Sequence, residues 1–456
     1  MTPLAQTDEA ITPRDWYEIA TIYAHNKAWG KAARFFAWAA EGEFEAAGVI
    51  TQGYIDSQIG LAMAQTKGGK TDAATLTISR IMEVSPTLQP YAFNVNGVLQ
   101  EELRQWVLAE TDFKTAISLQ PNNPVFGINL AHLYHVLGRF PEAEAAYDAV
   151  VKLDPTNLEA RFYRSLALLA QGKFKEGFQE YELRYATAPS PVPMNGKPTW
   201  RGEQDLTGKT ILMCAEQGIG DSIMCVRYAR WLKKFQKAAS VIVLAKPDLS
   251  KLLDFTNDVD FCVADPKEAE PYDFNVPMMS LPGLSLDQYG SIFYGPDQYI
   301  MVQYNKRFDI EATSPRVGFC WKGQPAHGND KFRSIDPQLY NPLLAMDITP
   351  VSLQYKALHG RMLDLGIDSL YDLAQAIQEL DLVITVDTSI AHIAGSLGVR
   401  TWVMLSPGAD FRWQLGSDDT PWYPSVRLFR AAKPLEWEDT IRHLANELEK
   451  LIGGVA

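Results

Sequence analysis

The sequence predicts an α-helical repeat array followed by two α/β lobes, a fold of the α plus α/β class. The first observation is a proline that recurs at intervals of 34 or 35 residues, at Pro86, Pro121, Pro155 and Pro189. The second is a change after Lys209, where short apolar runs begin to alternate with helical stretches. The third is length, because 456 residues exceed what one hydrophobic core holds.

The first 189 residues are expected to form an α-solenoid of about five repeated helix pairs. Each proline closes a segment of helical periodicity, at the point where Pro would stop the second helix of a pair. Small residues recur at matching offsets, as where Ala131 and Ala143 flank the turn at Gly138. This pattern, strongest in AHLYHVLGRFPEAEAAYDAVVKLDP, resembles the tetratricopeptide repeat. A single unit cannot bury its apolar face, so several must stack.

A proline-rich stretch marks the expected end of the array. Residues 190–198 are interpreted as a linker because their prolines and glycine cannot continue a helix. The two lobes are then expected over 199–312 and 313–434. Residues 435–456 are expected to form a last helix, with a return to the first lobe as one option.

The alternation after Lys209 predicts two Rossmann-like lobes, each with a parallel sheet. Strands are expected at 210–215, 240–245, 260–263, 316–321, 349–353, 381–386 and 401–405. Helices are expected at 221–234, 248–255, 370–379, 390–397 and 436–452. Ligands of such folds bind at the carboxyl ends of the strands, so the loops that follow the strands are the candidate sites.

Composition argues against several classes of function. A net charge of −13 is unfavourable for nucleic-acid binding, which requires clustered Lys and Arg. Apolar runs of the ~20 residues that a membrane helix requires are absent. The start MTPLAQTDEA lacks the basic and apolar parts of a secretory signal, so a cytoplasmic location is expected. Four cysteines stand singly and are expected to be buried free thiols, namely Cys214, Cys225, Cys262 and Cys320.

The first candidate loop is EQGIGD, from Glu216 to Asp221. Its glycines let the backbone approach a ligand at a helix N-terminus, but Ile223 stands where a dinucleotide fingerprint requires a third glycine. An acid after the glycines would repel a pyrophosphate, and it suits a base that faces a hydroxyl acceptor. Asp221 could instead cap the helix, and the two roles are compatible. The acceptor side of this loop is expected to comprise Glu216, Gln217, Gly218 and Gly220.

The second candidate loop, Trp321-Lys322-Gly323, follows the first strand of the second lobe. Lys322 at a strand end is well placed to neutralise a leaving diphosphate. Arg333 and Ser334 are expected to add to this site. The alternative is that Lys322 is an ordinary solvated surface lysine.

The third candidate loop, DTSIAH, runs from Asp387 to His392 between a strand and a helix. The hydroxyls of Thr388 and Ser389, with the helix dipole and free N–H groups, would form a phosphate site. His392 lies one turn into the helix, where it would either face the cleft or pack. Both alternatives stay open at the level of sequence.

Several of these stretches resemble known families. The segment GKTILMCAEQGIGDSIMCVRYARWL, with PTWRG before it, is similar to bacterial tetratricopeptide-repeat glycosyltransferases. The segment LDLVITVDTSIAHIAGSLGVRTWVML resembles the donor-binding signature of the heptosyltransferase family. The order of domains is similar to that of the O-GlcNAc transferases, which fuse the same repeat to a two-lobed catalytic region. The closing FRWQLGSDDTPWYPSVRLFR fits the repeat-fused group as well.

The resemblance implies a GT-B fold and an inverting glycosyl transfer from a nucleotide-sugar donor, with no metal and no further cofactor. It implies that Asp221 is the base and that Lys322 binds the diphosphate. The helix start at Asp387, Thr388 and Ser389 would bind the donor. The first lobe is shorter than in heptosyltransferases, which weakens the case for a lipid or polysaccharide acceptor. The D-x-D at residues 258–260 precedes a strand and is interpreted as a turn.

Two other functions remain open. A non-catalytic interaction protein would carry the same repeats on a degenerate GT-B scaffold. A phosphorylase-like enzyme would require a pyridoxal-bearing lysine, for which no motif is evident. For a transferase, the repeats favour a protein acceptor docked on the array, and the heptosyltransferase-like loops favour a glycan. The sequence predicts neither the sugar, the nucleotide nor the oligomeric state.

Overall fold

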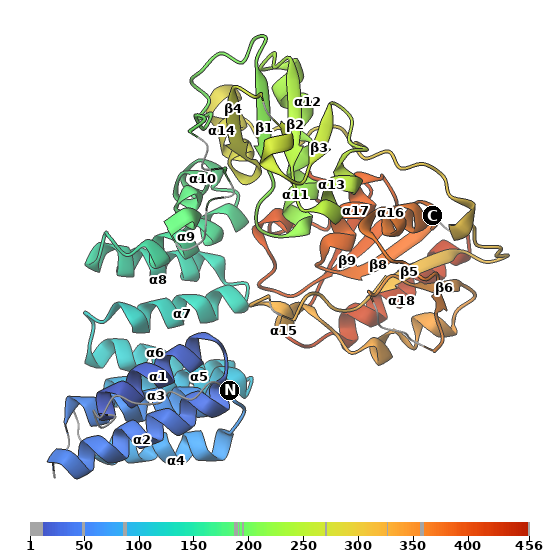
Figure 1. The fold of residues 1–456 in the computed structure, drawn as a ribbon. Helices are drawn as coiled ribbons and strands as arrows, with labels where there is room; N and C mark the ends of the chain where they lie inside the picture. The colour runs from blue at the N-terminus through green and yellow to red at the C-terminus, as the bar shows by residue number, and fades with distance from the viewer. Residues whose placement is uncertain are drawn as a thin grey trace, which may run out of the picture. The chain divides into compact units, whose positions relative to one another are not determined.

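The computed structural model describes residues 12–47, 51–84, 89–186, 190, 192–193, 196–269, 271–325, 327–355 and 360–454. The chain divides into two compact units. One comprises Met1–Tyr134 and Glu142–Ala160, and the other His135–Pro141 and Arg161–Ala456. The first unit is helical, and the second holds two sheets together with nearly all of the last helix pair (Figure 1).

Consecutive helices pair antiparallel through the repeat region (Figure 1). They are α1 (Pro13–His25), α2 (Trp29–Ala47), α3 (Gln52–Lys67), α4 (Thr71–Val84), α5 (Gln89–Glu102), α6 (Trp106–Leu119), α7 (Pro124–Val136), α8 (Phe140–Leu153), α9 (Leu158–Ala170) and α10 (Phe174–Tyr181). Pro121 and Pro155 follow the ends of α6 and α8, as the sequence predicts. Pro86 and Pro189, which mark the other expected ends, lie outside the described residues.

Small residues allow paired helices to approach closely. A Cβ atom on Gly97 of α5 would lie 2.6 Å from Cε1 of Phe113 on α6, closer than carbon atoms tolerate. Gly60 of α3 has the same relation to Phe36 of α2, also at 2.6 Å. The aromatic rings therefore fill the space that the missing side chains leave, which is the packing expected from the repeat pattern.

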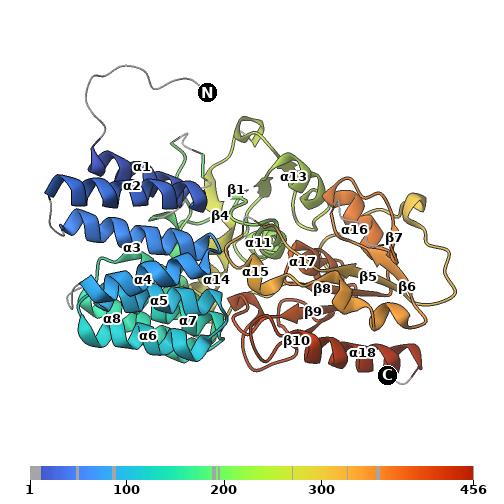
Figure 2. The same cartoon turned by 90° about the horizontal axis from the view of Figure 1, so that it is seen from below.

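The first sheet of the second unit is fully parallel, with strand order β3-β2-β1-β4 (Figure 1). Figure 2 shows two of its neighbouring strands, β1 and β4, from below. Its strands are β1 (Thr210–Cys214), β2 (Ser240–Leu244), β3 (Phe261–Val263) and β4 (Phe274–Pro277). Its helices are α11 (Ile219–Val226), α12 (Tyr228–Lys234), α13 (Pro247–Leu253) and α14 (Leu281–Tyr289). Central strand β1 is buried from Ile211 to Cys214, and these residues are all apolar, as expected of a strand covered on both faces.

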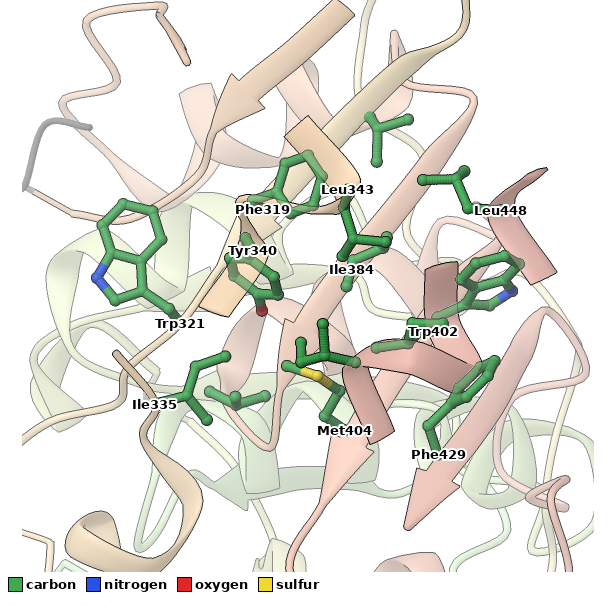
Figure 3. Close-up of a cluster of buried hydrophobic side chains, with 14 of the residues drawn as sticks. Phe319, Trp321, Ile335, Tyr340, Leu343, Ile384, Trp402, Met404, Phe429 and Leu448 are labelled. Carbon is green, nitrogen blue, oxygen red and sulfur yellow. The ribbon is translucent and has the colours of Figure 1, made fainter. Parts of the chain in front are cut away.

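The second sheet is also parallel, with strand order β10-β9-β8-β5-β6-β7. Its strands are β5 (Arg316–Cys320), β6 (Thr349–Ser352), β7 (Leu363–Asp364), β8 (Leu382–Val386), β9 (Thr401–Leu405) and β10 (Val426–Arg430). Its helices are α15 (Asp330–Arg333), α16 (Leu370–Gln378), α17 (Ser389–Ser396) and α18 (Glu438–Ile452). Phe319, Ile384 and Met404 from three neighbouring strands meet in one apolar core (Figure 3).

Short 3₁₀ turns connect these elements. They are η2 (Glu182–Ala186), η3 (Pro266–Ala269), η4 (Met278–Ser280), η5 (Lys306–Phe308), η6 (Pro337–Tyr340), η7 (Leu343–Ala345) and η8 (Phe411–Trp413).

Two parts of the lobes differ from the expectation. The last helix, α18, buries Ile441, Leu444 and Leu448 in the core of the second sheet, so the suggested return to the first lobe is wrong. The compact units also divide before the expected boundary at 189, because α10 and η2 pack with the α/β part. The expected linker lies only partly among the described residues, and the boundary in the sequence stays a prediction.

The two sheets are joined through helices and through one buried arginine. Helix α11 packs on α17, and α13 packs on α16. Arg227, between α11 and α12, donates to the carbonyl of Trp422 at 2.7 Å and to the hydroxyl of Tyr299 at 2.9 Å. A buried guanidinium needs such acceptors because burial removes its water. These contacts fix the loops after β1 relative to those of the second sheet.

None of the helices in the described ranges is long and apolar enough to span a membrane.

Candidate active site

The three candidate loops all follow strands of parallel sheets at their carboxyl ends. The loop from Glu216 to Asp221 follows β1, Lys322 follows β5, and the loop from Asp387 follows β8. Strands β5 and β8 are neighbours, and β9 lies next to β8. The loop after β9 therefore belongs to the same edge of the second sheet, although the sequence reasoning did not assign it to the site.

Asp221 occupies the first turn of α11, where its carboxylate binds the backbone N–H of the N-cap residue. Its Oδ2 atom accepts a hydrogen bond from the backbone N–H of Gly218 at 2.7 Å. Its Oδ1 atom lies 2.7 Å from Nη2 of Arg412, on the loop after β9. Burial raises the pKa of Asp221, and the Arg412 guanidinium acts in the opposite direction. The capping role is thus present, and the side chain keeps 18% of its surface exposed.

Arg412 links two acids, one from each side of the site. Its Nη1 atom lies 2.6 Å from Oδ1 of Asp410, while Nη2 faces Asp221. Burial alone would raise the pKa of Asp410, but the adjacent Arg412 lowers it overall. The Arg412 side chain is only 7% exposed, so both acids hold a buried cation in place. Sequence reasoning missed these two residues, although they follow an expected strand as the other candidate loops do.

His392 is packed rather than open to solvent. The residue is 5% exposed, its Nδ1 atom lies 2.9 Å from the hydroxyl of Tyr423, and its ring stacks on Trp413 at 5.2 Å. A Cβ atom on Gly220 would lie 2.5 Å from Cδ2 of this ring. Burial lowers the pKa of His392 to about 3, so the ring is neutral at ordinary pH. The sequence left open whether His392 faces the cleft or packs inside the lobe, and the structure shows that it packs. This position gives no support to the expected contact with the nucleotide sugar.

Gly220 therefore serves helix packing. Its missing side chain leaves room for the imidazole of His392, which brings α11 close to α17. This contact explains why a glycine stands at position 220 without an acceptor, so the expected approach of the backbone to an acceptor stays a prediction.

Lys322 extends from the end of β5 and is exposed. Its backbone N–H donates to Oε1 of Gln354 at 3.0 Å, and the neighbouring N–H of Trp321 donates to the same atom at 3.2 Å. Within the part of the chain that the structure describes, the Lys322 ammonium has no ion-pair partner. Gln354, which follows β6, thus holds the backbone of this loop, and no signal in a single sequence pointed to it.

Arg333 and Ser334 fold over the loop that contains Lys322, as expected for a shared site. The hydroxyl of Ser334 accepts a hydrogen bond from the N–H of Gly323 at 3.1 Å. The Arg333 guanidinium pairs with Asp330, Nε to Oδ1 at 3.2 Å, and lies directly over Gly323. Lys322, Arg333 and Ser334 therefore belong to one part of the second lobe, called the cationic segment below because it carries the Lys322 and Arg333 side chains.

The start of α17 lies beside this cationic segment. Burial and the nearby carboxylate of Asp410 raise the pKa of Asp387 to about 6, whereas Arg333 lowers it. Thr388 is the N-cap of α17, and its Oγ1 atom accepts from the N–H of Ile390 at 3.4 Å. Thr388 is buried and Ser389 is half-buried, so Ser389 is the more accessible of the two expected hydroxyls.

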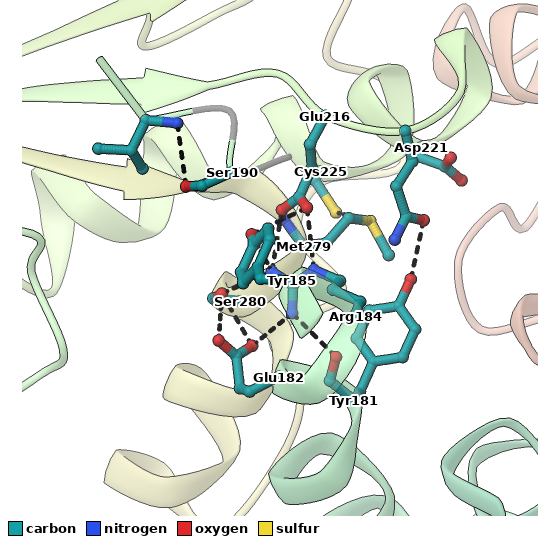
Figure 4. Close-up of polar contacts among 12 residues, drawn as sticks. Tyr181, Glu182, Arg184, Tyr185, Ser190, Glu216, Asp221, Cys225, Met279 and Ser280 are labelled. Carbon is teal, nitrogen blue, oxygen red and sulfur yellow. Dashed lines mark hydrogen bonds and ion pairs between the residues drawn. The ribbon is translucent and has the colours of Figure 1, made fainter. Parts of the chain in front are cut away.

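Glu216 is buried and held by other side chains, against the expectation of an acceptor contact (Figure 4). Its carboxylate pairs with Arg184, Nε to Oε2 at 2.9 Å, and also accepts from the N–H of Met279 at 2.8 Å. Gln217 adopts a positive φ of 56° and accepts a hydrogen bond from Tyr181 at 2.9 Å. Both residues therefore serve to hold the loop. Gly218 forms the N-cap of α11.

The cysteines and the D-x-D sequence agree with their interpretation. All four cysteines are free thiols; Cys214, Cys225 and Cys320 are buried and Cys262 is half-buried. Asp258 lies in a turn with φ of 69° and pairs with Arg230 at 2.7 Å. Across the described ranges, no group of three or more His, Cys, Asp or Glu side chains is arranged to hold a metal ion. A reaction without a metal stays a prediction.

Comparisons with known proteins agree with this architecture. Residues 128–193 match the family model of the tetratricopeptide repeat. The chain is 26% identical to Protein FlbA of Caulobacter vibrioides over 382 residues. This alignment covers 74% of this chain and 63% of that protein. The chain thus spans less than two thirds of the length of this relative.

Two solved structures are similar to this chain at low identity. One is a glycosyl transferase of family 9 from Veillonella parvula, with 12% identity, 55% of this chain and 92% of that chain covered, and a TM-score of 0.38. The other is an O-GlcNAc transferase from Thermobaculum terrenum, with 13% identity and a TM-score of 0.33, and the overlap covers 89% of this chain and 92% of that chain. The strand orders given above, rather than these overlaps, define the fold. The chain carries tetratricopeptide repeats, followed by two lobes that are each built on a parallel sheet.

Proposed function

We propose that this chain is an inverting, metal-independent glycosyltransferase that moves a sugar from a nucleotide-sugar donor to a hydroxyl group of an acceptor. The carrying observation is that Asp221 of the first lobe meets Arg412 of the second lobe at 2.7 Å. This contact puts a carboxylate where the carboxyl ends of two parallel sheets converge, which is where α/β folds bind ligands. A base facing a cationic and hydroxylated edge suits transfer to a hydroxyl.

In the proposed reaction, Asp221 accepts the proton of the acceptor hydroxyl. The oxygen then forms a bond to the anomeric carbon from the face opposite the diphosphate, and the bond from that carbon to the diphosphate oxygen breaks. The products are a glycoside with inverted configuration and a nucleoside diphosphate. A general base of this kind contributes ~10²–10⁴ in rate. The raised pKa of Asp221 makes it a stronger base than an ordinary aspartate.

The second lobe would receive the leaving diphosphate. Lys322 supplies an exposed ammonium, Arg333 a guanidinium that folds over the same loop, and Ser389 a hydroxyl at a helix N-terminus. Positive charge and backbone N–H groups at that point stabilise the negative charge that develops on the phosphate oxygens. Asp387, Thr388 and Ser334 hold these groups in place. The donor is the co-substrate, and no further cofactor is required by this chemistry.

We assign a protein as the acceptor class, because tetratricopeptide arrays expose repeated helix faces on which polypeptide segments dock. A glycan acceptor is the competing outcome. Incubation of the full chain with a panel of nucleotide sugars and a lysate of the source cells would separate them, by whether the label enters protein or polysaccharide.

The alternative function is that of a non-catalytic scaffold, and one observation favours it. Both carboxylate oxygens of Asp221 already have partners, because one accepts a hydrogen bond from Gly218 and the other forms the ion pair with Arg412. A retired site in which these bonds are permanent would bind no nucleotide. Thermal-shift measurements with nucleoside diphosphates and nucleotide sugars therefore divide the two functions.

Asp221→Asn provides the decisive variant. Asn still caps a helix, so the fold should persist, but it cannot accept a proton. We expect release of nucleoside diphosphate to fall at least ~10²-fold while nucleotide affinity changes little. Asp258→Asn is the matched control, because Asp258 also pairs with an arginine at 2.7 Å in the same lobe. Transfer that survives in Asp221→Asn would contradict the assignment of the base.

A further inference from the structure

We propose that Arg184, on the turn η2 after the last repeat helix, is a positioning residue for the loop that carries Asp221. The last repeat helix and the turn after it would then hold the reaction site in shape. The inference rests on the function proposed above and concerns how its base is placed. Three separate contacts lead to it.

The first contact is the ion pair between Arg184 and Glu216, which is closed to water (Figure 4). Nε and Nη2 of Arg184 reach the two oxygens of Glu216 at 2.9 and 3.0 Å, a bidentate arrangement. The two side chains are only 3% and 4% exposed. The Tyr185 hydroxyl adds a hydrogen bond to Glu216 at 2.9 Å. Each charge therefore depends on the other for its solvation.

The network around this pair joins three segments that are far apart in the sequence. Arg184 also donates to the carbonyl of Tyr181 at 3.2 Å, to Glu182 at 2.7 Å and to the hydroxyl of Ser280 at 2.8 Å. Ser280 ends η4, which follows β4, and Glu216 follows β1. Because β1 and β4 are neighbours, Arg184 ties the carboxyl ends of two adjacent strands to the last repeat helix.

The second contact holds the next residue of the loop. Gln217 adopts the left-handed conformation, with φ of 56°, which is unfavourable for a residue with a side chain. Its Oε1 atom accepts a hydrogen bond from Tyr181 on α10 at 2.9 Å. The surroundings must hold such a conformation in place. Two successive residues of the loop before Asp221, Glu216 and Gln217, are thus held by side chains of η2 and α10.

The third contact reaches the other partner of Asp221. The ring of Tyr181 packs on Phe411 with a centroid distance of 5.7 Å, and the ring of Phe178 packs on it at 6.3 Å. Phe411 directly precedes Arg412, which pairs with Asp221. Helix α10 therefore contacts side chains of both loops that carry the ion pair between the lobes, Gln217 on one and Phe411 on the other.

Loss of Arg184 would leave the Glu216 carboxylate buried without its cation, which is unfavourable. The loop would move to give Glu216 access to water, and the strained conformation of Gln217 would relax with it. Asp221 lies four residues after Gln217 in the same loop and would shift. A displacement of about 1 Å at a catalytic group can cost ~10²-fold in rate.

Arg184→Lys tests this with charge retained, because lysine cannot form the bidentate contact. We expect the kcat for transfer to fall ~10–100-fold while the Kd for nucleoside diphosphate stays within about twofold, since the donor groups lie on the other lobe. Arg164→Lys is the matched control. Arg164 forms a bidentate pair with Glu180 inside the same helix pair, at 2.8 and 2.5 Å, and neither residue belongs to the loop after β1.

Hydrogen exchange gives a second readout that does not depend on turnover. In Arg184→Lys, amides of residues 216–224 should exchange faster than in the unaltered chain, and those of β2 should not change. Arg164→Lys should leave both segments unchanged. This comparison also separates a displaced loop from general loss of stability.

Several results would overturn the inference. Equal loss of kcat in both lysine variants would mean that the helix pair matters only through its stability. An unchanged kcat in Arg184→Lys, or unaltered exchange at 216–224, would mean that the loop holds its shape without Arg184. If the unaltered chain transfers no sugar, the proposed function fails on its own, and the exchange experiment still decides whether Arg184 positions the loop.

Discussion

Gly220 on α11 lies against the imidazole edge of His392 on α17, where a Cβ atom would come within 2.5 Å of Cδ2. Gly220→Ala should therefore force the two helices apart. We expect a loss of ~1–3 kcal/mol in unfolding free energy, as for other overpacked sites. Chemical denaturation measures it, with Gly328→Ala as the control because nothing lies within 4 Å of its Cβ position. Equal stability of both variants would contradict the close contact.

The neutral state of His392 predicts a pH dependence of stability. Its pKa is lowered to about 3 in the folded chain, and the unfolded histidine takes up a proton near its ordinary value of 6.5. The unfolded state thus binds more protons between these values, so the contribution of His392 is complete above pH 6.5 and is lost as the pH falls toward 3. Thermal unfolding of the unaltered chain and of His392→Gln, compared from pH 7.5 to 4.5, measures this loss. If the difference between the two does not shrink on acidification, the neutral imidazole is contradicted.

Arg412 should set the acid limb of the pH–rate profile. Asp221 must be ionised to act as a base, and the Arg412 cation lowers its pKa against the effect of burial. Arg412→Gln removes that cation, so the pKa of Asp221 should rise further and activity should be lost at higher pH than in the unaltered chain. Arg412→Lys keeps the charge and should keep the limb near its original position. Profiles of kcat from pH 5 to 9 would decide, and coincident limbs in all three proteins would exclude Asp221 as the titrating base.

Lys322 should contribute to nucleotide affinity. The residue is exposed at the end of β5, directly before Gly323, over which the Arg333 guanidinium lies. Lys322→Ala should weaken the binding of nucleoside diphosphate about tenfold or more, because a hydrogen bond to a charged group contributes ~1.5–3 kcal/mol. Lys433→Ala, a change at a largely exposed lysine of the same lobe, serves as the control in calorimetric titration. Equal affinities would leave Lys322 as a solvated surface residue.

The long buried elements could be predicted from the sequence because their patterns are continuous. Strand β8, LVITV, is buried at every position, and all of its residues except Thr385 are apolar. Strands β4, β7 and β10 were missed for different reasons, and β7 has only two residues. Strand β4 is four residues long and ends in Pro277. Strand β10, VRLFR, has two arginines among its apolar residues and is an edge strand of its sheet.

The candidate site was predictable to the extent that the loops after strands are local in sequence. Arg412 and Gln354 could not be predicted as site residues, because their roles depend on partners distant in sequence. Arg412 pairs with Asp221, and Gln354 accepts from the backbone of Lys322. Glu216 was misassigned for the same reason. Its carboxylate is neutralised by Arg184, from a segment that the repeat pattern marked only as a helix end.

The ion pair of Arg184 and Glu216 also bears on protein engineering. The sequence boundary would place the junction of a chimera with another repeat array at the proline-rich stretch near residue 190. Such a junction would discard Arg184, Tyr181 and the rings that pack on Phe411. A junction between α8 and α9 would keep them, and it lies close to Ala160, where the last segment of the first compact unit ends. The portable module of this chain thus begins near residue 158, one helix pair earlier than its sequence boundary suggests.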